Sequence, residues 1–228
     1  MYTLYKRIYL SIQTQGFVYY LKLKSSELLY KHKLKQFNIN YPEGNIPLDA
    51  NISLNKDAKV NQASPYYEIK KAFSFINIKH KDIYLLDIGC GFGKVLNLGM
   101  MLHFKKVIGI DLDKSAVDTA IKNCEKVRMN GYLTDYNVSC ADASIYLIPD
   151  GINVIYLANP FGKSTMENVL DNIMQYFHKS NLPQLFIVYY KPLFADLILN
   201  YQQSTVIFES YSTNKILAEL AIFKIQAN

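Results

Sequence analysis

The sequence predicts an α/β fold in which a mostly parallel sheet carries helices on both faces. Two features support this prediction. Between residues 83 and 225, short apolar segments of strand length alternate with segments of helical periodicity, the pattern of a parallel sheet with crossover helices. The last two strand segments have no clear helix between them, so we expect them to form a hairpin at one edge of the sheet.

The expected elements follow in chain order. Residues 3–36 read as helical, and residues 38–62, rich in Asn with Pro and Gly, read as a linker. A helix is expected over 64–76, with Ser64 as its cap and Pro65 at its first position. We then expect strands at 83–88, 106–111, 136–140, 153–158, 184–190, 205–209 and 216–225, and helices at 93–104, 114–128, 164–178 and 192–200. The chain thus divides into an N-terminal arm and linker, residues 1–62, and an α/β domain, residues 63–228.

A glycine-rich turn closes the first strand of the domain. Residues 85–93 read Leu-Leu-Asp-Ile-Gly-Cys-Gly-Phe-Gly, so Gly89, Gly91 and Gly93 follow Asp87 at alternate positions. Glycine accepts positive φ and lets the backbone approach a ligand closely. A turn of this kind is typical of folds that bind nucleotides.

The glycine spacing excludes two common nucleotide motifs. The dinucleotide pattern GxGxxG requires a glycine at position 94, which is Lys94. A phosphate loop, GxxxxGK[ST], is excluded because Val95 follows that lysine. The remaining pattern, DxGxGxG, resembles motif I of class I S-adenosylmethionine-dependent methyltransferases. That resemblance implies S-adenosyl-L-methionine as cofactor and a sheet of order 3-2-1-4-5-7-6, with strand 7 antiparallel.

Two further acids follow strands in the order that this family keeps. Asp111 ends an apolar strand 22 positions after Gly89, about where such folds place the carboxylate that holds a ribose diol. Asp142, followed by Ala143, closes a short strand and is similar to the family's adenine-binding acid. The resemblance implies that the cofactor contacts Asp87, Gly89, Cys90, Gly91, Gly93, Asp111, Leu112, Asp142, Ala143 and Asn159.

A fourth strand, 153–158, runs into the position of the family's target-side motif. Asn159-Pro160-Phe161 resembles the [DN]PP[FYW] motif of amino-group methyltransferases, with one proline missing. In that motif the Asn oxygen and the following Pro carbonyl accept hydrogen bonds from the target NH2, and the aromatic ring stacks on the target. The same residues also resemble the Asn and Phe of non-SET histone lysine methyltransferases, and the Asn-Pro-Phe-Gly motif of small bacterial methyltransferases. We expect Asn159, Pro160 and Phe161 to be catalytic.

Several of these residues also have a structural interpretation. Asp113, two residues after Asp111, is expected to cap the next helix instead of binding a metal. Cys90 is also explained by packing alone. Ser164 and Glu167 form the pattern of a capping box. The three cysteines and four histidines show no zinc spacing and no HExxH motif, so we expect no metal.

The net charge of +6 lies in the N-terminal arm. Residues 1–36 contain seven Lys or Arg and one acid, Glu27, and residues 37–228 are neutral. Interleaved tyrosines and lysines suit an acidic macromolecular partner, either protein or nucleic acid. A second interpretation is that the arm packs its apolar side on the domain and solvates its lysines. The sequence leaves both open.

Composition restricts the class of protein. The chain has 228 residues, half of them hydrophobic, which is enough for one open α/β core. It contains no run of about 18 apolar residues, and its start lacks the pattern of a signal peptide. We therefore expect a cytoplasmic protein. The resemblance, together with the basic arm, implies an enzyme that methylates an amino group on a macromolecule. The alternatives are a small-molecule or glycan methyltransferase, with the arm as a lid or dimer element, and a non-catalytic binding module.

Overall fold

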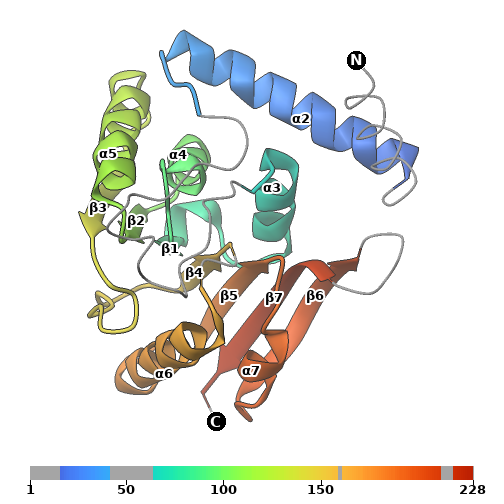
Figure 1. Ribbon diagram of the computed structural model, residues 1–228, viewed down its shortest axis with the longest axis vertical. Coiled ribbons are helices and arrows are strands. Elements are labelled where there is room, and N and C mark those ends of the chain that lie inside the picture. Colours follow the sequence, from blue (N-terminus) through green and yellow to red (C-terminus); the bar gives the residue numbers. More distant parts are fainter. Residues whose placement is uncertain (1–15, 42–63, 159–160, 212–217, 228) are drawn as a thin grey trace.

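The computed structural model describes residues 16–41, 64–158, 161–211 and 218–227. These residues form a seven-stranded sheet of order β3-β2-β1-β4-β5-β7-β6 (Figure 1). The pairs among β1 to β5 are parallel, and β7 is antiparallel to both β5 and β6. The predicted strand order is therefore confirmed. The strands are β1 Tyr84–Ile88, β2 Lys106–Asp111, β3 Asp135–Cys140, β4 Val154–Leu157, β5 Gln184–Tyr190, β6 Ser204–Tyr211 and β7 Ala218–Gln226.

Helices cover both faces of the sheet (Figure 1). One face carries α3 Tyr66–Phe75, α4 Lys94–Met101 and α5 Lys114–Met129, with α2 Phe17–Gln36 lying across them. The other face carries α6 Lys163–Lys179 and α7 Ala195–Leu199. Strand side chains alternate between the two faces and so pack into two cores. On β1, Leu85 faces the first core, beneath α3, α4 and α5, and Leu86 faces the second core, beneath α6 and α7.

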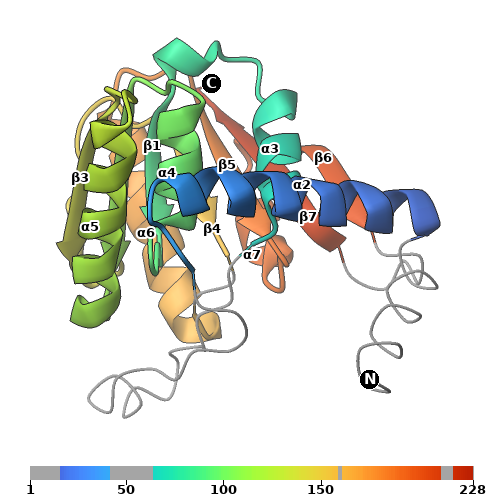
Figure 2. The same ribbon diagram turned by 90° about the horizontal axis from the view of Figure 1, so that it is seen from above.

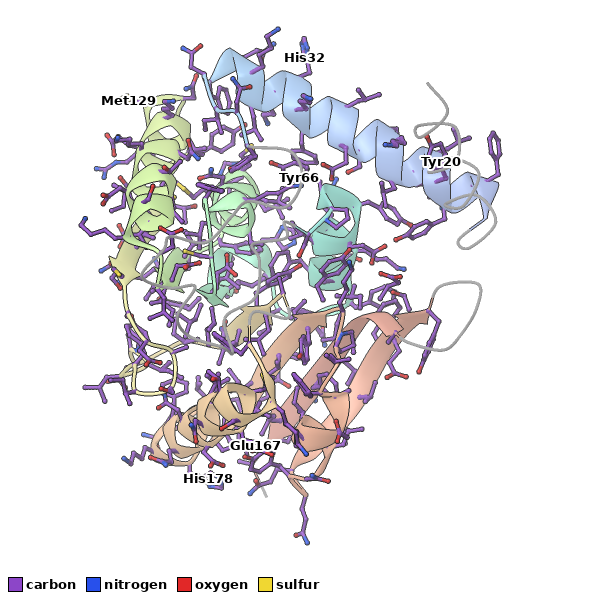
Figure 3. The ribbon with its side chains drawn as sticks, viewed as in Figure 1. Tyr20, His32, Tyr66, Met129, Glu167 and His178 are labelled. Atoms are coloured by element: carbon purple, nitrogen blue, oxygen red, sulfur yellow. The ribbon has the colours of Figure 1, made fainter. Side chains whose placement is uncertain are left out.

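The N-terminal helix α2 is part of the packed structure. Its inner side buries Tyr30 and Leu34, and Ile39 follows in the same core. The ring of Tyr30 stacks on that of Tyr66, with centroids 4.6 Å apart. Figure 2 shows α2 running in front of α3 and α4, and Figure 3 shows Tyr66 beneath it. The predicted helix over 3–36 is thus found from Phe17 onward, while residues 1–15 and most of the predicted linker, 42–63, lie outside the described residues.

Two predicted helix caps are wrong. Ser64 does not cap α3, because the helix begins at Tyr66, whose N–H donates to Oε1 of Glu27 in α2. The acceptor therefore comes from another helix, which local sequence cannot show. Ser164 and Glu167 form no capping box, since α6 begins at Lys163 after Gly162, and no side chain caps it.

Candidate active site

The glycine turn is attached to the neighbouring strand by its backbone. The N–H groups of Gly89 and Cys90 both donate to the carbonyl of Ile110, at 2.9 and 3.0 Å, and Gly93 N–H closes the turn on the Cys90 carbonyl. Gly89, Gly91 and Gly93 have φ values of 78°, 50° and 79°, a region that L side chains rarely adopt. The turn therefore requires the glycines that the sequence places there.

Asp111 holds the same turn with its side chain. Its Oδ2 accepts the Gly91 N–H at 2.8 Å, and its Oδ1 accepts the Asp113 N–H at 2.9 Å. Burial raises the pKa of Asp111, and these backbone donors oppose the rise. Each carboxylate oxygen has two lone pairs, so both retain acceptor capacity for the hydroxyl groups of a ligand.

Asp113 is a helix cap, as predicted. Its side chain accepts hydrogen bonds from the N–H groups of Ser115 and Ala116 at the start of α5. Such caps stabilise a helix by about 0.5–2 kcal/mol. Within the described parts of the chain, no three His, Cys, Asp or Glu side chains are grouped as metal ligands would be.

Asp87 is the most unusual group at this edge of the sheet. Only 2% of it is exposed, and its Oδ2 has no hydrogen-bond partner among the described residues. Burial raises its pKa well above the ordinary value of 3.8, and the charge of Asp111 adds to the rise. A buried carboxylate without a partner is costly. Its position next to the glycine turn therefore indicates a site for a ligand with positive charge or donor groups.

The third predicted acid, Asp142, follows β3, the strand that pairs with β2. Asp142 is exposed, and its Oδ1 accepts both the N–H and the hydroxyl of Ser144. Ala143, by contrast, is buried in the second core. The backbone before them is joined to β2, since Ala141 N–H donates to the Asp111 carbonyl and Cys140 Sγ contacts that of Leu112.

Two other predicted site residues have clear packing roles. Cys90 is buried. Its side chain fills the space above Gly109 of β2, because a Cβ placed on Gly109 would lie only 2.9 Å from the Cys90 Sγ. Phe161 is half-buried and packs against the second core, on the side of α6. Asn159 and Pro160 lie outside the described residues.

Sequence reasoning missed a contact from the N-terminal helix. Glu27 of α2 accepts a hydrogen bond from Lys94 Nζ at 3.1 Å, while Lys94 lies 4.0 Å from the centroid of the Tyr66 ring. Burial lowers the pKa of Lys94, and Glu27 opposes this change. The signal in the sequence was weak: Glu27 is the one acid among seven basic residues in 1–36. The arm therefore reaches the residue that follows the glycine turn.

Comparisons with known proteins agree with this geometry. The family model for ribosomal protein L11 methyltransferase (PrmA) matches residues 73–160. This stretch spans the glycine turn and all three acids. In the order of its sheet and over this stretch of its sequence, the chain is similar to class I methyltransferases. A comparison with curated protein sequences finds no match.

Solved methyltransferase structures share the fold at low sequence identity. A candidate methyltransferase from Escherichia coli has a TM-score of 0.57 and 14% identity, covering 73% of this chain and 90% of that one. A candidate methylase from Haemophilus influenzae has a TM-score of 0.54 and 16% identity, covering 70% and 97%. Magnesium protoporphyrin IX methyltransferase from Synechocystis, solved with bound S-adenosylmethionine, has a TM-score of 0.51 and 12% identity, covering 70% and 76%.

The acid pair restricts which cofactor the protein can hold. Asp87 and Asp111 are both buried or half-buried next to the turn. An acid at the position of Asp111 holds a ribose in dinucleotide-binding folds as well, but the charge of Asp87 beside the turn would repel phosphates placed there. The two acids suit a cofactor that presents an ammonium group, a sulfonium and ribose hydroxyls, because these groups are cationic or donate hydrogen bonds. The residues present therefore fit S-adenosylmethionine.

Proposed function

We propose that the protein transfers a methyl group from S-adenosylmethionine to an amino group of a macromolecule, either a protein side chain or a nucleic-acid base. The observation that carries the cofactor assignment is the Asp87 oxygen that has no hydrogen-bond partner among the described residues, beside the turn that Asp111 holds. In this assignment Asp87 faces the cationic amino-acid part of the cofactor. Asp111 accepts hydrogen bonds from its ribose, and the loop with Asp142 and Ala143 faces its adenine.

The bound cofactor supplies an electrophilic methyl group on a positively charged sulfur. The enzyme therefore has to align the acceptor with that methyl group and exclude water. Asn159 and Pro160 are proposed to orient the acceptor NH2 through their oxygen atoms, and Phe161 is proposed to border it. Their place supports this role, because they follow β4, which lies beside β1 at the switch point of the sheet.

The basic helix α2 supports a macromolecular acceptor. Lys22, Lys24 and Lys35 are exposed on it, together with apolar side chains such as Leu28 and Leu29, which are 68% and 63% exposed. Lysines on one exposed helix attract an acidic partner over a range of about 8 Å at physiological ionic strength.

Within the described residues, no helix is both long and apolar enough to cross a membrane.

One observation favours a second candidate, a small-molecule or glycan methyltransferase with α2 as a lid. The inner side of α2 packs against α3, and Glu27 contacts Lys94 beside the glycine turn. A helix in this position borders the proposed site whether or not its outer side binds anything.

Transfer of radiolabelled methyl from S-adenosylmethionine into a cell extract distinguishes the two candidates. The extract is divided and digested with protease or with nuclease before the label is separated by size. We expect large labelled species that one of the two enzymes degrades. Label found only in small molecules, unaffected by both digestions, would support the second candidate. The absence of any transfer by folded protein would overturn the proposed function.

A further inference from the structure

A second group of buried and half-buried polar side chains lies beside Asp87, toward the ends of β4 and β5. Tyr156 of β4 is the register partner of Asp87, and Tyr190 is the last residue of β5. At the start of β7, the Glu219 carbonyl accepts the Lys191 N–H, which places Glu219 beside the end of β5. The first turn of α3 adds Glu68, and Tyr19 of α2 donates a hydrogen bond to Oε1 of Glu68. We call Tyr19, Glu68, Tyr156, Tyr190 and Glu219 the tyrosine–glutamate cluster.

Three buried polar atoms in and beside this cluster have no hydrogen-bond partner elsewhere among the described residues: Oε2 of Glu68, and the hydroxyls of Tyr156 and Ser64, which pair only with each other. The residues that carry them are 1%, 0% and 3% exposed. Each buried unpaired polar atom costs about 1–3 kcal/mol. The unpaired Oε2 of Glu68, next to the proposed cofactor site, therefore marks a place that the donor group of a ligand would complete.

The charges and rings of the cluster define the chemistry of that ligand. Burial raises the pKa of Glu68, and Glu219 adds to the rise, while the Tyr19 hydroxyl and Lys71 oppose it. Burial raises the pKa of Tyr190, and the charges of Glu219, Glu68 and Glu27 add to the rise. Lys71 also lies 5.2 Å from the centroid of the Phe208 ring. Two carboxylates among tyrosine rings suit a cation, since rings and carboxylates both attract positive charge.

We propose that the tyrosine–glutamate cluster is the acceptor pocket and that it receives an aliphatic ammonium group, carried by a lysine side chain or by a free amine. This inference rests on the proposed function, and it narrows the amino groups allowed there. A nucleobase amino group is neutral and would leave the two carboxylates with Lys71 as their one nearby counter-charge among the described residues. A polyanion would be repelled by them.

The proposal also assigns a role to Glu68. An aliphatic ammonium has a pKa of about 10.4 and no free lone pair until it loses a proton. That proton passes to the carboxylate of Glu68, and the neutral nitrogen forms the new N–C bond with the methyl carbon. The C–S bond of the methylsulfonium donor breaks, and its electron pair stays on sulfur as a neutral thioether. The product is a methylammonium, and Glu68 returns its proton to solvent.

The first test is binding to the wild-type protein. With S-adenosylhomocysteine bound, we expect calorimetry to show saturable binding of n-butylammonium chloride and none of n-butanol at the same concentration. Absence of n-butylammonium binding to protein that does bind S-adenosylhomocysteine would overturn the ammonium pocket and leave the proposed function standing. Failure to bind S-adenosylhomocysteine would instead count against the proposed function itself.

The second test uses variants and three acceptors: n-butylamine, a lysine-containing peptide and a single-stranded oligonucleotide. For whichever amine is methylated, we expect Glu68→Gln to lower kcat/KM by about 100-fold or more. The fall in kcat/KM at low pH that protonation of Glu68 causes should disappear in this variant. Its affinity for the cofactor should be unchanged. Glu219→Gln should raise KM for the amine, and exposed Glu209→Gln on β6 is the matched control. Preference for the peptide over n-butylamine would assign the ammonium to a protein. If the oligonucleotide is methylated, and at the same rate in Glu68→Gln and Glu219→Gln as in the wild type, the proposal is refuted.

Discussion

The ammonium group of Lys94 lies 3.1 Å from Oε2 of Glu27, although 67 positions separate the two residues in the chain. The Lys94 side chain is 13% exposed and that of Glu27 is 33% exposed. Lys94 is the residue directly after the glycine turn, and the same Glu27 carboxylate accepts the first N–H of α3. One acid in the N-terminal helix therefore joins two elements that border the proposed cofactor site.

We predict that Glu27→Gln destabilises the protein by about 1–3 kcal/mol, because a mostly buried ammonium then loses its counter-charge. Chemical denaturation measures the change. Lys22→Gln, an exposed substitution on the same helix, should change stability by less than about 0.5 kcal/mol. A double-mutant cycle with Lys94→Met should give a coupling of about 1 kcal/mol. Additive effects would show that the two side chains do not stabilise each other.

A second prediction separates backbone strain from packing in the turn. Gly93 has a φ of +79°, and a Cβ there would lie 3.1 Å from Cβ of Ala120, whereas Gly131 has a φ of +91° and nothing within 4 Å. Gly131→Ala should cost about 1 kcal/mol through its left-handed conformation alone. Gly93→Ala should cost more, since α5 must also move away. Equal losses of unfolding free energy would mean that the contact with α5 contributes nothing.

The third prediction concerns the dependence of stability on pH. The pKa of Asp87 is raised in the folded protein by burial and by Asp111. A carboxyl group of this kind contributes most to stability below its ordinary pKa, and this contribution is lost as the pH rises through the raised value. Asp87→Asn should therefore stabilise the ligand-free protein at pH 8, with a smaller gain at pH 4, while weakening cofactor binding. Thermal unfolding at both pH values decides this, and a destabilised variant at pH 8 would contradict it.

The fourth prediction concerns the residues after β4. If Asn159 orients the acceptor, Asn159→Ala should lower kcat by about 100-fold while the cofactor dissociation constant stays near that of the wild type. Steady-state kinetics with the acceptor identified in the extract, combined with calorimetry, provide both quantities. Asn168→Ala, in the following helix, is the matched control. A parallel loss of cofactor affinity would assign Asn159 a structural role instead.

Local sequence was sufficient for most of the fold. The bounds of β2 and β5 were predicted to the residue, because an apolar strand followed by a turn is a local signal. The cap at Asp113 was also local. The errors arose where a partner came from a distant part of the chain, as with Ser64, whose expected role at α3 belongs to Glu27.

The candidate site was predictable only along the strands. The sequence placed Asp87 and Asp111 at adjacent strand ends, and the sheet order brings them together. It did not show that Asp111 would accept the Gly91 N–H, or that Tyr19 would lie on Glu68. The first contact depends on the exact path of the turn. The second depends on how α2 crosses the domain, and the exposed and buried residues of α2 show no simple helical pattern in the sequence.

Calorimetric titration with S-adenosylmethionine is the measurement that tests the central claim most directly. The account predicts one site per chain, no binding of NAD, and a loss of about 1.5–3 kcal/mol of binding free energy in Asp111→Asn, since that residue both holds the turn and accepts ribose hydroxyls. Asp118→Asn, on the exposed side of α5, should bind as the wild type does. Folded wild-type protein, free of co-purified ligand, that binds neither S-adenosylmethionine nor S-adenosylhomocysteine would contradict the account.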